Sequence, residues 1–420
     1  MTPPHPTAAT SAPVAATLFA LTYAALAIGR VPGLRVDRAG IAVVGAAAMV
    51  AGGVLSLDEA ARAVNVETIV LLFGMMVVVA YLTMAGFFAL ATTRIAAACS
   101  GPRTLLAVTI GLSGVLSAFL VNDVVCVALT PLILDLCRRL RRPPIPYLVG
   151  LATASNVGSV ATITGNPQNI IIGSLSQISY LRFAARLAPV AAIGLVLDFA
   201  VVALVYRGML AATTPGEPGP GLVPGARVHR PLLAKALLVT AATVALFFTG
   251  LNIAVIALAA AGFLMLERVN PRKVYAAVDW PLLIMFMGLF VVVHAFDVRV
   301  VQHWGIDRWG AIRRSPVVLV SGLSVALSNL VSNVPAVLLF EPLLKVMPAA
   351  SREPAWLALA MSSTLAGNLT VLGSVANLIV VEGARRSGTE LGFVEYLKVG
   401  VPLTILTTLV GVAWLALAHY

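Results

Sequence analysis

The sequence contains very little charge: acidic and basic residues make up 11% of its 420 residues, while 60% are hydrophobic. Soluble domains carry about a quarter charged residues, so this composition excludes an ordinary soluble protein. It predicts an all-α polytopic membrane protein with most of its length in contact with the lipid bilayer. The net charge of +11 could suggest nucleic acid. However, no basic face lies outside the loops between apolar runs, so we predict no nucleic-acid partner.

Cysteine is equally scarce, and Cys99, Cys126 and Cys137 show neither C-x-x-C nor metal-ligand spacing. We therefore predict no metal site and no cofactor, and we favour a buried free thiol over a soft-metal ligand at Cys126. The H-E-x-x-H and G-x-S-x-G motifs are also absent, which argues against an enzyme. Residues 1–13 lack the basic start of a cleaved signal peptide and are interpreted as a tail.

What the sequence does have is a long apolar segment, 147–175, whose middle is wrong for an ordinary spanning helix. Gly165 and Pro167 break it, and the Ser, Thr and Asn side chains lie at about mid-membrane depth. Broken backbone is tolerated there only where protein or water satisfies its polar groups. A second broken helix at 355–381 repeats the pattern at an offset of 208 residues. The matching pairs are Ser155 with Ser363, Thr162 with Thr370, Gly165 with Gly373, and Asn169 with Asn377.

A hairpin precedes each broken helix. The apolar stretch within 103–140 is too long for one span of ~20 residues and carries Asn122-Asp123 in its middle, so we predict a re-entrant hairpin with that tip. The second hairpin, 316–349, has Ser332-Asn333 at its tip. An odd number of about five spans per half predicts inverted repeats. The predicted organisation is a tail at 1–13, a first repeat at 14–207, a Pro/Gly-rich cytoplasmic linker at 208–230, and a second repeat at 231–420.

Basic residues predict the orientation, because Lys and Arg are enriched in cytoplasmic loops. The cluster Arg138–Arg142 is expected inside. This places both termini on the external side of the inner (plasma) membrane. Segments 87–100 and 299–314 are shorter and carry charge, so we predict interfacial arm helices there.

The two tips and the two breaks are predicted to converge near the midplane, where half-helix ends offer N–H groups to anions and carbonyls to cations. The alternative for the tip residues is helix capping, since Asn, Asp and Ser are good N-caps. The predicted substrate- or ion-binding residues are Asn122, Asp123, Ser155, Asn156, Thr162, Thr164, Gly165, Asn166, Asn169, Ser332, Asn333, Ser363, Thr364, Asn368, Thr370, Gly373, Ser374 and Asn377.

Asp123 breaks the symmetry of the tips, because Val334 occupies the equivalent position. An intramembrane acid is a functional hypothesis by default, so Asp123 is predicted to couple transport to an ion, with a structural cap as the alternative. Asp198 lies within an apolar helix, and its partner cannot be assigned from the sequence. Glu341 and Lys345 are four residues apart on one helix and are predicted to form an ion pair.

Taken together, paired hairpins with Asn tips and broken spans bearing Ser-Asn…Thr-x-x-Gly-Asn-Pro-x-Asn resemble the ion transporter superfamily over about residues 15–418. Leu120–Asp123 is similar to the hairpin of arsenite–antimonite permeases, and Gly165–Asn169 is similar to an anion-permease branch near them. The resemblance implies a secondary active transporter that moves a small anion or metalloid oxyanion by alternating access. It further implies coupling to H⁺ or Na⁺ and a scaffold domain that often forms a homodimer.

The main alternatives are a Na⁺-coupled di- or tricarboxylate symporter and a Na⁺/H⁺ antiporter of the same superfamily. Carboxylate symporters of that group carry Ser-Asn-Thr at both tips, whereas here only Ser332–Val334 approaches that sequence. A passive channel built on half-helices is disfavoured, because Asn166-Pro167 is not repeated at Ser374-Val375.

Overall fold

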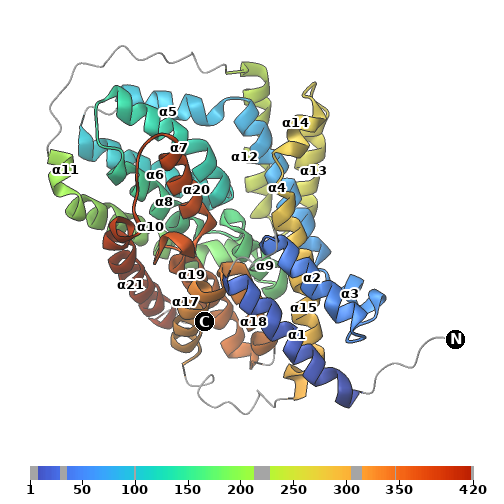
Figure 1. The fold of residues 1–420 in the computed structure, drawn as a ribbon. Helices are drawn as coiled ribbons and strands as arrows, with labels where there is room; N and C mark the ends of the chain where they lie inside the picture. The colour runs from blue at the N-terminus through green and yellow to red at the C-terminus, as the bar shows by residue number, and fades with distance from the viewer. Residues whose placement is uncertain are drawn as a thin grey trace.

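The computed structural model describes residues 8–28, 36–98, 101–211, 228–303, 315–345 and 347–417. Within these ranges the regular structure is entirely helical (Figure 1). By length and composition, six helices could cross a bilayer, which confirms the predicted all-α polytopic membrane class. They are α4 (Val66–Met84), α6 (Pro102–Phe119), α10 (Tyr180–Val205), α12 (Arg230–Phe247), α15 (Trp280–Arg299) and α21 (Phe393–Leu417).

The first half adds shorter helices to α4, α6 and α10. Their order follows the predicted spans, although α11 occupies the first residues of the predicted linker, and 212–227 lie outside the described residues. The added helices are α1 (Ala8–Ile28), α2 (Arg38–Ala51), α3 (Leu57–Ala63), α5 (Phe87–Ala98), α7 (Asn122–Arg139), α8 (Ile145–Ser159), α9 (Pro167–Ser176) and α11 (Arg207–Ala211).

The second half adds a corresponding set to α12, α15 and α21. The predicted arm at 299–314 can be followed only through the end of α15 and a short 3₁₀ turn, η2 (Val301–His303), because 304–314 lie outside the described residues. The other helices are α13 (Ile253–Met265), α14 (Pro271–Ala276), α17 (Pro316–Val331), α18 (Asn333–Lys345), α19 (Ala349–Ala366) and α20 (Val375–Arg386).

Both predicted breaks are present. After α8 the backbone leaves the helix, forms the single 3₁₀ turn η1 (Ile163–Gly165), and resumes as α9. Pro167 occupies the first turn of α9, where its missing N–H costs no helical bond. In the second half α19 ends, η4 (Val371–Gly373) follows, and α20 begins. The two interruptions therefore have the same local construction.

Both predicted hairpins are present as well. Leu120 and Val121 separate α6 from α7, and Ser332 alone separates α17 from α18. Ser332 has φ 78° and ψ 158°, a region that is populated almost only by glycine. The second tip is therefore a strained, one-residue reversal. On α18 the predicted ion pair is confirmed, with Lys345 Nζ 2.7 Å from Glu341 Oε1.

In one helix bundle, helices of the first half pack against helices of the second half; this bundle is called the exchanged bundle below. Helix α4 packs on α13 of the other half, and α15 packs on α2. Glycines allow both contacts: a Cβ added to Gly74 would lie 2.7 Å from the backbone of Ala257, and one added to Gly288 would lie 2.7 Å from the backbone of Ala42. Matching glycines in the two halves thus make matching contacts, as a repeat requires. The inverted orientation itself remains a prediction.

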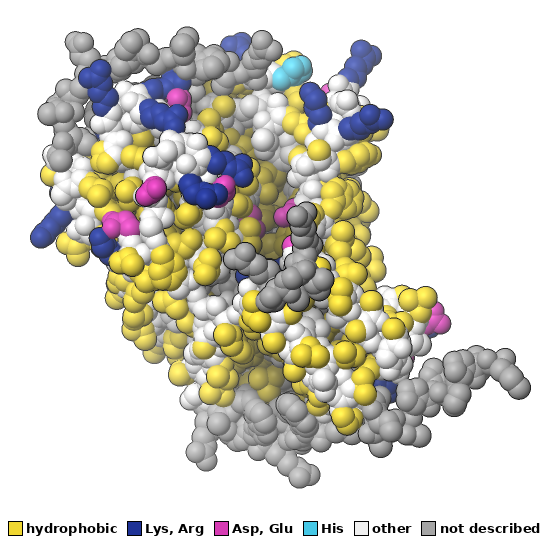
Figure 2. All heavy atoms as spheres, in the orientation of Figure 1, with side chains coloured by type: hydrophobic (Ala, Val, Ile, Leu, Met, Phe, Trp, Pro, Cys, Tyr) yellow, Lys and Arg dark blue, Asp and Glu magenta, His cyan; other side chains and the backbone are white. Residues whose placement is uncertain are grey.

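The outer surface fits a bilayer environment. Leu238, Val196 and Leu409 are 70%, 68% and 63% exposed, and broad apolar stretches cover the face in Figure 2. Lys and Arg side chains gather toward one end of that view. At the same end, α5 runs across the bundle as a single helix (Figure 1). The sidedness of this basic end, and hence the external placement of the termini, remains a prediction.

Candidate functional site

A cavity of about 460 Å³ opens where the two hairpin tips meet the two broken helices. Its wall includes Asn122 and Asp123 from the first tip and Asn333 from the second. It also includes the first residues of α9, α20, α2 and α15. Figure 2 shows acidic side chains in a hollow near the middle of the face drawn. The structure thus brings both predicted tips to one space, at the junction with the helices that form the exchanged bundle.

The cavity is surrounded by helix N-termini. Helices α7, α9, α18 and α20 begin at Asn122, Pro167, Asn333 and Val375, and all four of these residues line it. The first N–H groups of a helix have no intrahelical partner and carry a partial positive charge of roughly half an elementary charge. The arrangement therefore favours oxygen-rich or anionic solutes at this point.

The two tip asparagines are buried in the cavity wall, and each has an acceptor oxygen without a partner among the described residues. Asn122 and Asn333 are only 3% and 8% exposed, and the Oδ1 atom of each has no hydrogen-bond partner within the described residues. Asn122 Nδ2 donates to Asn156 Oδ1 at 3.0 Å. Asn122 does not cap α7, because the N-cap position is Val121 and no side-chain cap bond forms. The capping alternative is therefore wrong for Asn122.

Asp123 lies in the first turn of α7 and lines the cavity, with Val334 at the equivalent place on α18. Ser374 and Val375, at the start of α20, line the same cavity as Asp123, and the backbone N–H of Ala376 donates to Ser374 Oγ at 3.2 Å. The predicted coupling residue thus shares the cavity wall with the start of the broken helix of the other half. The alternative role predicted for Asp123 was an N-cap of α7. The N-cap position of α7 is Val121, and no side-chain cap bond forms there.

Two further carboxylates and one guanidinium also line this space. Asp37 and Asp279 are the N-caps of α2 and α15, accepting from Gly40 N and Leu282 N. Arg38 is the first residue of α2. With Asp123, the lining carries three acidic groups and one basic group among the described residues. A multiply charged anion would therefore meet little net compensation from side chains.

Beneath the cavity, Asn156 of α8 forms the centre of a buried amide network. Its Nδ2 donates to Asn368 Oδ1 at 2.8 Å and to Asn377 Oδ1 at 3.0 Å. Its Oδ1 accepts from Asn122 Nδ2 and from Ser374 Oγ, both at 3.0 Å. All the hydrogen-bonding capacity of this amide is used, so one residue locks three segments that are distant in the sequence.

The second repeat has a residue equivalent to Asn156, and it contacts the broken helix of the first repeat. Thr364 stands 208 residues after Asn156 and accepts from Asn166 Nδ2 at 3.1 Å and Gln168 Nε2 at 3.3 Å. Its hydroxyl also lies 3.4 Å from Asn169 Oδ1. Asn166 and Asn169 are the counterparts of Ser374 and Asn377 at the same offset. Each broken helix therefore contacts the other through equivalent positions.

The equivalent residues Asn169 and Asn377 each bond the backbone at the break of their own helix. Asn169 Nδ2 donates to the carbonyls of Ser159 and Thr162, both at 3.0 Å. Asn377 Nδ2 donates to the carbonyls of Gly367 and Thr370 at 2.7 and 3.0 Å. These carbonyls lie where the helices end, and buried carbonyls need protein donors. The two asparagines supply those donors.

The remaining predicted residues support the backbone instead of lining the cavity. Thr162 donates to the Ala118 carbonyl of α6, and Thr164 shares a 2.8 Å contact with the Tyr180 hydroxyl of α10. Ser155 bonds within α8 and accepts from Cys126 Sγ at 3.2 Å.

The predicted set thus divides into three groups. The cavity wall contains Asn122, Asp123, Ser332, Asn333 and Ser374; the buried network contains Asn156, Asn166, Asn169, Thr364, Asn368 and Asn377; the backbone supports are Ser155, Thr162, Thr164, Gly165, Ser363, Thr370 and Gly373.

Several residues at the site were not predicted from the sequence. Gln168 lines the cavity within a motif that had already been singled out. Asn329 donates to the Ala366 carbonyl at 3.1 Å and lies beside Gly373; a second Asn four residues before Asn333 was an available signal. Arg38 and Asp279 reach the cavity from the exchanged bundle, and no local pattern marks them.

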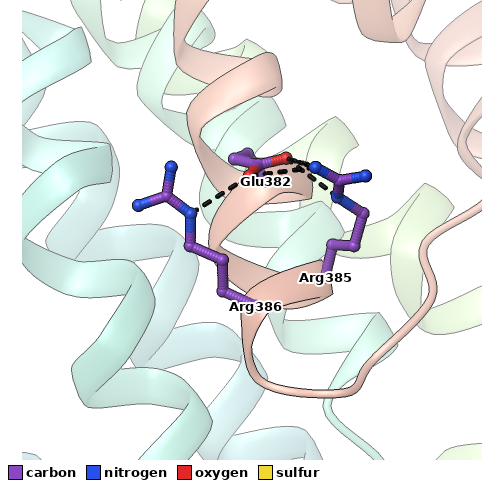
Figure 3. Close-up of polar contacts among 3 residues, drawn as sticks. All are labelled: Glu382, Arg385 and Arg386. Atoms are coloured by element: carbon purple, nitrogen blue, oxygen red, sulfur yellow. Dashed lines mark hydrogen bonds and ion pairs between the residues drawn. The ribbon is translucent and has the colours of Figure 1, made fainter.

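The far ends of α7 and α20 are also joined. Arg138 Nη2 donates to the Ser387 carbonyl at 3.1 Å. On α20, Glu382 accepts from Arg385 and Arg386 (Figure 3). These two guanidinium groups hold the pKa of the Glu382 carboxyl below its usual value. The parallel pair α7 and α20 is therefore fixed at its exposed end as well as at the cavity.

For metal chemistry, the described residues include no cluster of three or more His, Cys, Asp or Glu side chains. Cys126 and Cys137 are buried free thiols, and Cys99 lies outside the described residues. The site is thus an amide and hydroxyl site with one carboxylate at a tip.

Residues 17–364 match the model of a protein family described as citrate transporter, CitMHS. The chain belongs to the citrate transporter family. Its members are transporters, so the predicted absence of enzyme activity is confirmed by family. Among relatives of this family member, the silicon efflux transporter LSI3 of Oryza sativa subsp. japonica is 30% identical, with 91% of this chain and 93% of that protein aligned.

Two further comparisons agree with that membership. A transporter of Dictyostelium discoideum named arsB is 26% identical over 90% of this chain and 87% of its own length. The YdaH transporter of Alcanivorax borkumensis has a similar fold, with a TM-score of 0.59 and 17% identity over 99% of this chain and 97% of that chain. The predicted relation to the ion transporter superfamily is confirmed by these matches.

Proposed function

We propose that this citrate transporter family member carries a small, weakly acidic, hydroxylated solute of the arsenite or silicic acid kind across the membrane by alternating access. One observation carries the proposal. Asn122 and Asn333 line a 460 Å³ cavity where four half-helix N-termini meet, and the buried Oδ1 atom of each has no hydrogen-bond partner among the described residues. Such a cavity offers both acceptors for O–H groups and N–H donors for oxygens.

The charge of the lining favours a solute of low charge. Among the described residues that line the cavity, Asp37, Asp123 and Asp279 are acidic and Arg38 is basic. A divalent or trivalent anion brought out of water needs close compensation, whereas a metalloid hydroxide that is mainly uncharged at neutral pH needs hydrogen bonds. Its hydroxyl groups can donate to the tip amides while its oxygens accept from the helix ends.

The names of two relatives support the same solute class. One is a silicon efflux transporter and the other is named arsB. Silicon and arsenic share the chemistry of small, weakly acidic hydroxides. The predicted class of small anion or metalloid oxyanion is therefore narrowed here to its hydroxylated, weakly charged members.

Asp123 is proposed to couple this transport to protons. It is the acid at a tip, it shares the cavity wall with the start of α20, and the equivalent position on α18 is Val334. Gain or loss of a proton there would change the charge of the cavity wall next to the start of α20. Placement in the plasma membrane, external termini and a homodimer remain part of this proposal.

A second candidate is a citrate-type carboxylate carried with Na⁺. The description of the family favours it, and Arg38 could pair with a carboxylate of the solute. A Na⁺/H⁺ antiporter is the remaining alternative. These candidates differ from the main proposal in their dependence on Na⁺.

Flux into proteoliposomes tests these candidates. Arsenite, silicic acid, citrate and sulfate are each offered with and without Na⁺ and with and without a pH gradient. We expect arsenite or silicic acid flux that follows the pH gradient. The variant Asn333→Leu, which removes a tip acceptor, should lose that flux, while Ser363→Ala, buried but away from the cavity, should retain it. Citrate flux that requires Na⁺, with no metalloid flux, would overturn the proposal.

The coupling role is tested separately with Asp123→Asn. This change preserves the size of the side chain and removes its titration. We expect exchange of solute across the vesicle membrane to continue, while accumulation driven by a pH gradient is lost. Asp135→Asn, an exposed carboxylate paired with Arg139, is the matched control and should behave as wild type. Normal gradient-driven accumulation in Asp123→Asn would end the coupling role.

A further inference from the structure

A second intramembrane acid lies away from the cavity. Asp198, on α10, is 0% exposed. Its Oδ1 lies 2.8 Å from Thr153 Oγ1 of α8, and its Oδ2 has no hydrogen-bond partner in the described part of the chain. None of the ion pairs formed by the described residues includes it. A carboxylate in this position would be a buried charge with one hydrogen bond, which costs several kcal/mol.

The hydrogen bonds of the Thr153 hydroxyl indicate that Asp198 is protonated. Thr153 Oγ1 lies 2.8 Å from the Val149 carbonyl and 2.8 Å from Asp198 Oδ1. A hydroxyl has one proton to donate, and a carbonyl can only accept. If Thr153 donates to Asp198, its single proton is shared between two acceptors; if both contacts are full two-centre hydrogen bonds, Thr153 donates to Val149 and the acid donates to Thr153. The acid must then carry the proton between the two oxygens.

We propose that Asp198 is a proton-binding site, occupied in this conformation, whose proton is held between its carboxyl group and the Thr153 hydroxyl. The ligand is H⁺ itself. No other donor within the described residues reaches Oδ2. Loss of the proton would therefore require the Thr153 hydroxyl to turn from Val149 toward the acid.

Thr153 links this proton to the network under the cavity. Its carbonyl accepts from Asn368 Nδ2 at 3.2 Å, and Asn368 Oδ1 accepts from Asn156 at 2.8 Å. A change at Thr153 is therefore two hydrogen bonds from the crossing of the broken helices. The role of this link in transport rests on the proposed function; the presence of the proton does not.

The groups around Asp198 leave it without a compensating cation. Tyr396 of α21 is fully buried, interacts electrostatically with Asp198, and has a hydroxyl without a partner in the described residues. Glu395 and Lys398 of α21 pair with each other, and Arg182 of α10 pairs with Glu353 of α19. Other titratable or charged residues on α10 or at its C-cap are Tyr180, Arg186 and Tyr206. Those on the elements that pack against it are Tyr147, Arg103, Arg207 and Arg352, and Cys126 of α7 lies near Tyr396.

Infrared spectroscopy of the full-length protein in lipid nanodiscs tests the protonation directly. A protonated carboxyl group shows a carbonyl stretch that a carboxylate lacks. We expect the wild-type minus Asp198→Asn difference spectrum at neutral pH to contain that band, and the wild-type minus Asp135→Asn spectrum to lack it. Absence of the band from the first difference overturns the proposal.

Thr153→Val provides a test that does not remove the acid. The change retains the shape of the side chain and deletes the hydrogen bond, so the band should persist and move to higher frequency. Thr243→Val is the matched control, because Thr243 is also buried and bonded to the carbonyl four residues earlier. It should leave the band in place. An unmoved band in Thr153→Val would overturn the assignment of the proton to this pair.

The link to transport is tested by arsenite flux. In Asp198→Asn, accumulation driven by a gradient of one pH unit should fall about tenfold, because one coupled proton supplies a tenfold ratio per pH unit (~1.4 kcal/mol), while counterflow exchange stays near wild type. Unchanged accumulation would overturn the link. If wild-type vesicles move no arsenite, the proposed function fails, and the infrared band still decides whether Asp198 holds a proton.

Discussion

Replacing Asn156 with alanine should be among the most costly single changes in the molecule. The amide makes four buried hydrogen bonds of 2.8 to 3.0 Å, to Asn122, Asn368, Ser374 and Asn377. At a net value of about 1 kcal/mol per bond, their loss amounts to ~4 kcal/mol, and partners left unpaired raise the cost further. We expect the free energy of unfolding in mixed micelles to fall by about that amount.

The neighbouring Ser155→Ala is the matched control. Ser155 is equally buried and donates within its own helix, so its removal should cost only about 1 kcal/mol. The double variant Asn156→Ala with Asn377→Ala should then lose less than the sum of the single losses, because the two share a bond. If Asn156→Ala unfolds with the same free energy as the control, the buried network is not what joins the broken helices.

Three further predictions concern other parts of the structure. Ser332→Gly should stabilise the protein by about 1 kcal/mol by relieving its backbone conformation, measured by unfolding; a loss like that of Ser328→Gly, within helix α17, would contradict it. Gly74→Ala and Gly288→Ala should each cost ~1–3 kcal/mol through overpacking, with Gly262→Ala, which meets no neighbour, near neutral; a large cost at only one of the pair would argue against equivalent contacts. Because the folded-state pKa of Glu382 is lowered, its stabilisation is present above the usual glutamate pKa and is lost as pH falls through the lowered value. The stability difference between wild type and Glu382→Gln should therefore vanish in acid and shrink in high salt; a difference that is constant with pH would refute it.

The helix breaks could be predicted from the sequence more reliably than the residues that contact them. Gly165, Pro167 and Gly373 within apolar runs indicate broken helices for a local reason, since glycine and proline are poor helix residues and polar side chains are costly in lipid. Hairpin tips were predicted on similar grounds. The roles of the site residues were harder, because whether Thr162 faces the cavity or the Ala118 carbonyl depends on a neighbouring helix.

Long-range pairs were beyond the sequence for the same reason. Asn156 and Asn377 are separated by 221 residues, and nothing local to either specifies the other. Arg38 and Asp279 resemble ordinary loop charges and helix caps until the bundle places them at the cavity. The repeat offset was the one long-range signal in the chain, and it correctly aligned Asn156 with Thr364 without revealing that each contacts the opposite broken helix.

The pairing of α7 with α20 has a consequence for biosynthesis. The ribosome completes α7 at Arg139 and α20 only at Arg386, so at ~5–20 residues per second the first hairpin waits tens of seconds for its partner. During that interval the amide of Asn156 lacks its partners Asn368, Ser374 and Asn377. A nascent chain must therefore hold polar groups in the translocon or the lipid until its last segments arrive. The two halves acquire their final packing together, late, and as a single event.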